Sequence, residues 1–94
     1  MAGIIKISSI GRSLVAGETL KVGYGKGLLV ITSQSGGWSA CYVVSFGSIY
    51  EISVDDRARS QVSVAVVDGF VEITNTYSNS RSISALLIGY WFYA

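Results

Sequence analysis

Apolar and polar residues alternate along most of this chain, and glycine-rich breaks separate the alternating stretches. This period of two is that of β-strands, whereas no long window repeats apolar residues at the three- and four-residue spacing of a helix. The pattern therefore predicts an all-β chain. About eight short strands with turn signals every 8 to 12 residues favour an antiparallel, jelly-roll-like β-sandwich that forms a single domain over residues 1–94.

The first half of the chain predicts five of these strands. They are expected near residues 4–10, 20–24, 27–33, 38–46 and 48–54. The stretch 27–33 is apolar on both faces, which is typical of a central strand. Bends are expected at Ala16-Gly17, Gly36-Gly37 and Gly47-Ser48, because glycine tolerates the backbone angles that turns require.

The second half contains the clearest local signal. Asp68-Gly69 lies between two alternating runs and predicts a hairpin with a type I′ turn, in which Val62, Val64 and Val66 face the same core as Val71 and Ile73. The charged stretch before it, residues 55–61, is expected to be a solvated loop. A polar turn after it leads into the last strand.

The last strand ends in a hydrophobic stretch with two dry faces. From Ala85 onward neither side offers water anything polar except the hydroxyls of two tyrosines. One face can cover the sandwich core, and copies of the same chain that meet about a common axis can cover the other. The predicted interface residues are Leu87, Gly89, Trp91 and Tyr93, or their neighbours of opposite parity.

Composition supports self-association, because the chain holds more apolar material than one small core needs. Half of its 94 residues are hydrophobic and 14% are charged, and the mean hydropathy is +0.49. No membrane insertion is expected, since the longest apolar run, residues 85–94, is about half of the roughly 20 residues that a spanning helix needs. The net charge of +1 is spread without a cluster, so no nucleic-acid partner is expected.

The residues that usually carry catalysis are scarce. Histidine is absent, which removes the most frequent general base and metal ligand. The carboxylates at five positions indicate turns or outward strand positions rather than a facing pair: Glu51, Asp55, Asp56, Asp68 and Glu72. The single cysteine, Cys41, has apolar neighbours and is expected to be structural. We therefore expect no enzyme activity, no cofactor and no metal ion.

Glycan binding needs only an exposed aromatic ring beside hydroxyls or amides, and the chain offers these at two loop tips. Tyr24 lies between glycines, and Tyr77 lies in a polar turn near Asn79 and Arg81. These four residues are the candidate ligand-binding residues. For Trp38, which begins a strand after two glycines, anchoring of the core is the preferred interpretation.

Three stretches carry a resemblance to a known class of proteins: "AGETLKV", "GLLVITS" and "VDGFVEITNTYSNSRSISALLIGY". In this order, over residues 14–94, they resemble small trimeric β-sandwich domains at the tips of bacteriophage tail fibres and of related head-fibre proteins. The resemblance implies a homotrimer in the virion, with a jelly roll of the tumour-necrosis-factor or complement-head type. It also implies host contacts through variable loops, without assigning any individual residue.

The expected function is that of a non-catalytic virion structural or attachment domain. It would be made in the host cytoplasm without a signal peptide, because the first residues show no basic segment followed by an apolar stretch and a cleavage site. Its expected partners are its own copies and a glycan or protein of the host surface. The alternative is a monomeric or dimeric carbohydrate-binding module of a bacterial surface or secreted protein.

Overall fold

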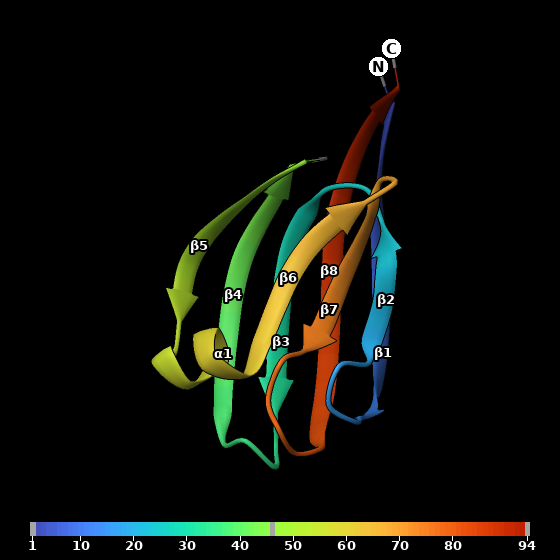
Figure 1. Ribbon diagram of the computed structural model, residues 1–94. Coiled ribbons are helices and arrows are strands. Elements are labelled where there is room, and N and C mark those ends of the chain that lie inside the picture. The colour runs from blue at the N-terminus through green and yellow to red at the C-terminus, as the bar shows by residue number, and fades with distance from the viewer. Residues whose placement is uncertain (1, 46, 94) are drawn as a thin grey trace.

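Two antiparallel sheets pack against each other in the computed structural model (Figure 1), which describes the backbone of residues 2–45 and 47–93 and the side-chain surroundings of residues 5–45 and 47–89. The larger sheet has the order β1 (Ala2–Leu14), β8 (Arg81–Tyr93), β3 (Gly27–Ser33), β4 (Trp38–Ser45), β5 (Ser48–Val54). The smaller sheet has the order β2 (Thr19–Tyr24), β7 (Phe70–Asn75), β6 (Val62–Val67). The predicted eight-stranded all-β sandwich is confirmed, and the jelly-roll type stays a prediction.

The core lies between the sheets and consists of alternate residues of facing strands. Leu29 and Ile31 of β3 are fully buried, as are Val71 and Ile73 of β7. Trp38, at the start of β4, is only 4% exposed, which confirms its predicted place in the core. Removal of these apolar side chains from water is the main force that holds the two sheets together.

The β6–β7 hairpin is confirmed with its predicted turn. Asp68 has a φ of 53° and Gly69 a φ of 81°, and positive φ at both central residues defines a type I′ turn. Val67 pairs with Phe70 across the turn. The pairing places Val62 in the same core as Val71, as the alternation predicted.

The stretch 55–61 is not the solvated loop that its charges suggested. It contains a short helix, α1 (Asp56–Gln61), whose first turn is capped because the Asp55 side chain accepts a hydrogen bond from the backbone N–H of Arg57 at 2.9 Å. Ala58 and Gln61, three residues apart and therefore on one helix face, are buried. The charged residues occupy the solvent side, so the helix is amphipathic despite its polar composition.

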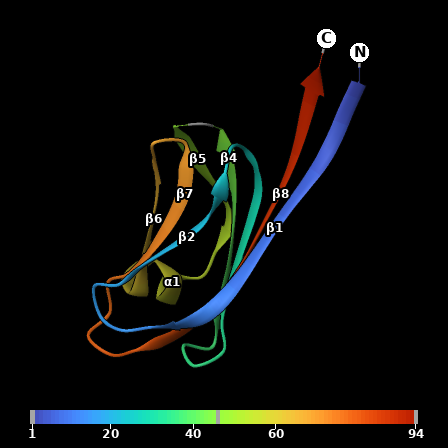
Figure 2. The ribbon, with the colours of Figure 1, turned by 90° about the vertical axis from the view of Figure 1, so that its right-hand side faces the viewer.

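The first and last strands continue beyond the rest of the sandwich as a two-stranded ribbon (Figures 1 and 2). β1 and β8 pair along their whole length, from Leu14 with Arg81 to Ala2 with Tyr93. β3 pairs with β8 only over residues 84–88. Residues 2–6 and 89–93 therefore pair only with each other, and we call them the ribbon. It contributes to an elongated shape of 47 × 22 × 20 Å.

Candidate functional site

Three rows of side chains cross the outer face of the five-stranded sheet. Because Leu29 and Ile31 of β3 and Leu87 of β8 point into the core, their immediate neighbours point outward. Strand pairing then defines an apolar row: Ile7, Ile88, Leu28, Val43 and Tyr50. The middle row is Ser9, Leu86, Val30, Cys41 and Ser53. The hydroxyl row is Gly11, Ser84, Thr32 and Ser39.

None of the residues in these rows is charged, and the apolar row is open to solvent in a single copy of the chain. Ile7 is 64% exposed, Tyr50 60% and Val43 40%. The outer side of the smaller sheet differs, because Lys21 and Glu72 pair there across β2 and β7. A contiguous exposed apolar surface of this kind marks an interaction site.

A shallow hollow of about 490 Å³ lies on the same outer face, around Gly11. Strands β1, β8 and β3 line it with small or neutral side chains, among them Ser9, Thr32, Ser84 and Leu86. No charged group lines this hollow, so it suits a neutral side chain rather than an ionic ligand.

The structure assigns the two sides of the last strand differently. Leu87 is 3% exposed in the core and Gly89 is also buried, so these two predicted interface residues lie inside a single copy. Their neighbours Leu86 and Ile88 belong to the outer face. The side chains of Trp91 and Tyr93 lie outside the described residues. In the described part of β8, the residues that remain available for an interface are therefore these neighbours, which the sequence predicts as the alternative set.

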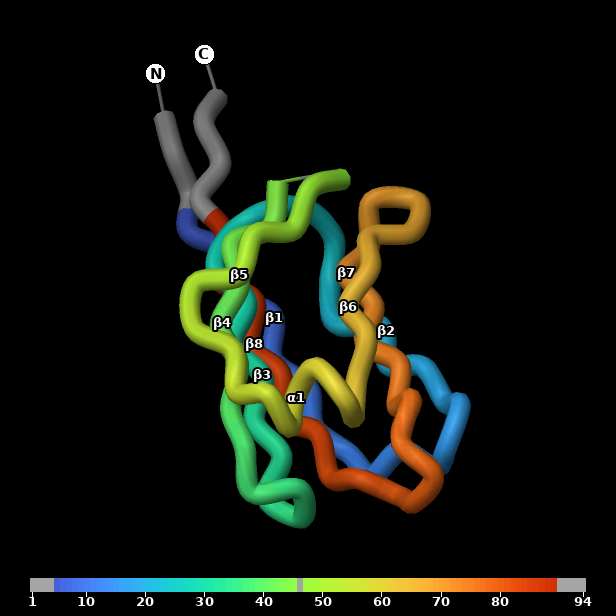
Figure 3. Tube along the Cα trace, turned by 60° about the vertical axis from the view of Figure 1, so that its left-hand side comes forward, coloured from blue at the N-terminus to red at the C-terminus, as the bar shows by residue number. Residues whose placement is uncertain are grey.

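The end of the sandwich opposite the ribbon gathers three loops, between β1 and β2, β3 and β4, and β7 and β8 (Figure 3); we call it the polar end. Gln61 Oε1 accepts hydrogen bonds from Trp38 Nε1 at 2.8 Å and from Arg81 Nε at 2.7 Å. The Arg81 guanidinium also lies over the ring of Tyr77, 4.1 Å from its centroid. Tyr77 and Arg81 are thus brought together as sequence proximity suggested, but each supports the loop structure.

Asn79 and Gln61 differ from what the sequence suggested. Asn79 contributes its backbone carbonyl, which accepts a hydrogen bond from Asn75 Nδ2 at 3.0 Å. Gln61 links the helix to Trp38 and to β8 and was not identified from the sequence. Its only local signal is its position three residues after Ala58, which becomes meaningful once the helix is known.

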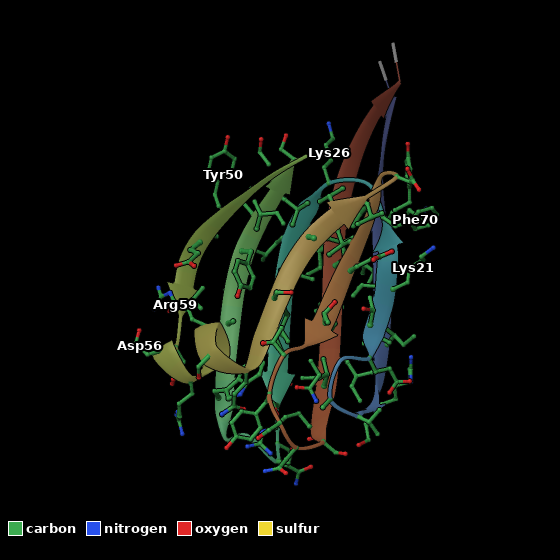
Figure 4. The ribbon with its side chains drawn as sticks, viewed as in Figure 1. Lys21, Lys26, Tyr50, Asp56, Arg59 and Phe70 are labelled. Atoms are coloured by element: carbon green, nitrogen blue, oxygen red, sulfur yellow. The ribbon has the colours of Figure 1, made fainter. Side chains whose placement is uncertain are left out.

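Tyr24 lies at the other end of the sandwich from Tyr77, because these residues flank opposite ends of the β2–β7 pair. Its ring meets that of Phe70 edge-on with centroids 5.3 Å apart, and Lys21 Nζ lies 4.6 Å from the Phe70 centroid (Figure 4). Tyr24 is 46% exposed. The four candidate ligand-binding residues therefore fall into two separate places rather than one site.

Several carboxylates form surface ion pairs. Glu51 and Asp56 both contact Arg59, at 2.6 and 2.5 Å, beside α1 (Figure 4). Glu18 contacts Arg12 at 2.8 Å. The hydrogen bond from Arg59 lowers the pKa of Glu51, and that from Arg12 lowers the pKa of Glu18. Both groups therefore stay ionised to a lower pH than an unpaired glutamate would.

Metal-ligating residues do not gather in the described part of the chain: no three of its His, Cys, Asp or Glu residues lie close enough together to hold an ion. Cys41 is free and half-buried in the middle row. These placements leave the prediction of a non-catalytic protein without a cofactor as it stood.

Acid should weaken the start of α1 through Asp55. Its pKa is lowered from 3.8 to about 2, mainly because its side chain accepts a hydrogen bond from the Arg57 side chain. A second hydrogen bond, from the backbone N–H of Arg57, lowers the pKa further. A carboxyl whose folded pKa is depressed stabilises the fold above its unfolded pKa, and this contribution is lost as the pH falls from about 4 toward 2. The expected result is that Asp55→Asn, compared with the unchanged protein, shows a smaller loss of stability between pH 5 and pH 2.5 in urea unfolding. Identical losses would contradict the assignment.

Comparison with known proteins gave no matching family model, no matching curated protein and no matching solved structure. In the described residues, no helix is both long and apolar enough to cross a membrane. The resemblance to phage-fibre domains stays a prediction.

Proposed function

We propose that this chain is a non-catalytic structural and attachment module of a virion, a homotrimer of phage-fibre or spike type. Copies of the chain cover the apolar surface that one copy exposes, and the polar end faces the host surface. The observation that carries this proposal is the ribbon, in which residues 2–6 and 89–93 pair without a third strand.

A two-stranded ribbon is marginally stable in water unless a third strand or another layer supports it. Within the described chain the ribbon has no third strand, since β3 pairs with β8 only as far as Ile88. Residues 90–93 are Tyr-Trp-Phe-Tyr, and Ile5, near the base of the ribbon, is 67% exposed. A long apolar edge strand without cover promotes aggregation. Contacts with other copies supply the cover without further sequence.

The position of the polar end supports the attachment part of the proposal. Both described chain ends lie at the tip of the ribbon (Figure 1), and the loops between β1 and β2, β3 and β4, and β7 and β8 lie at the other end of the sandwich. These loops are rich in hydroxyl, amide and charged groups, which suit recognition of a hydrated surface. In a fibre that continues from the ribbon side, the polar end would point outward.

The mass of the purified chain in solution tests this proposal. Light scattering coupled to size-exclusion chromatography should give three times 10.0 kDa, or 30 kDa. A mass of one chain would contradict the trimer and favour the alternative of a monomeric carbohydrate-binding module. A mass of two chains would contradict the trimer as well and favour the dimeric form of that alternative.

A further inference from the structure

We propose that the outer face of the five-stranded sheet is the contact surface between copies, and that three copies place this face toward a threefold axis that runs along the strands. This inference rests on the homotrimer proposed above and adds the surface and the direction of the axis. The described elements leave this face uncovered, because the second sheet and α1 lie on the opposite side (Figure 2).

The chemistry of the face selects a second copy as its occupant. The three rows contain no charge, so a charged partner would lose hydration without gaining an ion pair. The apolar row needs an apolar surface of similar width, and another copy of the same face provides one. Its most exposed members, Ile7 and Tyr50, lie on the two edge strands, so apolar surface extends across the full width of the sheet.

The order of the rows fixes the direction of the axis. Going down the strands from the ribbon, the rows change from apolar, through mixed, to hydroxyl-bearing. An axis parallel to the strands brings equal levels together, so Leu28 and Val43 meet apolar residues and Thr32 meets hydroxyls. A twofold axis across the strands would set the hydroxyl row of one copy against the apolar row of another, where buried hydroxyls cost free energy unless they find partners.

The width of the sheet suits three copies. Five strands spaced about 4.8 Å apart span roughly 19 Å, and a triangle with sides of this length has its axis about 5.5 Å from each side, close to half of the roughly 10 Å between packed sheets. Three such faces can therefore enclose a core of ordinary thickness. At each corner, the β1 edge of one copy would lie beside the β5 edge of the next, so both free edges are covered.

A matched pair of substitutions tests the surface. Val43 lies in the apolar row and is 40% exposed, whereas Val67 lies on β6 of the other sheet and is 45% exposed. Val43→Lys should reduce the mass in light scattering from three chains to one, because the assembly would have to bury three unpaired charges. Val67→Lys should keep the mass of three chains. Far-UV circular dichroism establishes that both variants remain folded.

Each outcome of this comparison is decisive. A Val43→Lys variant that stays trimeric would overturn the proposed surface and leave the homotrimer intact. Dissociation of both variants would also overturn it, because the effect would not depend on the face. An unchanged protein that is itself a monomer would overturn the homotrimer and, with it, this inference.

Energy transfer between labelled copies tests the axis. Dyes are attached to a cysteine introduced at one of two exposed positions, Ser48→Cys at the start of β5 or Gln34→Cys after the end of β3. Both variants carry Cys41→Ser, so that each has one cysteine. The two positions lie at opposite ends of β4, about 25 Å apart along the strand. Mixed assemblies with donor and acceptor at the same position should transfer more efficiently than assemblies with one dye at each position. The reverse order would overturn the parallel arrangement. As a control, the labelled assemblies must have the same mass as the unlabelled protein.

Val43→Ser provides a milder test of the surface than Val43→Lys, because it removes apolar area without adding a charge.

Discussion

Gly27→Ala is expected to lower the free energy of unfolding by about 4 kcal/mol or more, a loss that few mechanisms reach. Gly27 begins β3 with a φ of +143°, and such strained backbone costs roughly 1–3 kcal/mol for a residue with a side chain. A Cβ there would also clash with the carbonyl oxygen of Ile88 and lie 2.8 Å from the Cα of Gly89. Because these are backbone atoms of β8, the two strands would have to separate.

Two other glycines provide the controls for this prediction. Gly17 has a φ of +82° with nothing within 4 Å of a Cβ, so Gly17→Ala measures backbone strain alone. Gly47 has open space and no positive φ, so Gly47→Ala should be nearly neutral. Urea unfolding followed by tryptophan fluorescence, at one protein concentration, compares the three variants. A Gly27→Ala loss within about 1 kcal/mol of the Gly17→Ala loss would contradict the close approach, because strain alone would then explain it.

Gly27 also connects stability to assembly. It precedes Leu28, which is the last residue of β3 to pair with β8 on the ribbon side, opposite Ile88. Beyond this point β8 continues with β1 alone, so the crowded contact between Gly27 and Gly89 marks the base of the ribbon. A side chain at residue 27 would therefore displace the ribbon as well as weaken the sheet, and the proposed apolar row begins at this level.

The sequence predicts best those features that depend on neighbouring residues. Asp68-Gly69 specifies its turn because the backbone angles are a property of two residues, and the alternation in 62–75 then fixes which valines are buried. The sandwich class follows from many such local signals. The burial of Trp38 is predicted from local features as well, because its large apolar side chain directly follows a glycine turn.

Features that depend on distant pairing could not be predicted in this way. The pairing of β1 with β8 brings the two ends of the chain together. The sequence of neither strand indicates which other strand it pairs with. The sequence does not decide which face of β8 packs on the core, because both faces are apolar after Ala85. Ser82 and Ser84, which share a side with Leu86, indicate the solvent face. The helix α1 was missed because six residues carry too few apolar positions to show a period.

The candidate site shows the same division. Local spacing placed Tyr77 and Arg81 together correctly, but the role of their contact depends on Gln61, which arrives from another segment. The apolar row needs strand order and register before it exists at all, because its five members come from five strands. Sequence motifs cannot identify a surface of this kind, and it can be defined only when the pairing of the strands is known.

Asn75→Ala is expected to lower the free energy of unfolding by roughly 3 kcal/mol, because three backbone groups lose a buried or partly buried hydrogen bond worth about 1 kcal/mol each. The Asn75 side chain is fully buried. Its Nδ2 donates to the carbonyl oxygens of Leu14 at 2.9 Å and Asn79 at 3.0 Å, and its Oδ1 accepts from the N–H of Tyr77 at 2.9 Å. One amide thus holds the end of β1 against the β7–β8 loop at the polar end.

The matched control for this change is Asn79→Ala, which removes an exposed side chain but keeps the carbonyl that Asn75 uses, so its cost should stay within about 0.5 kcal/mol. Hydrogen exchange at the Tyr77 amide should become faster in Asn75→Ala and stay unchanged in Asn79→Ala, since only the first variant removes its acceptor. Asn75→Asp keeps one acceptor but loses both donated bonds and buries a charge, so it should be at least as damaging as alanine at neutral pH. An Asn75→Ala variant as stable as Asn79→Ala, with an equally protected Tyr77 amide, would show that the polar end is held by other contacts.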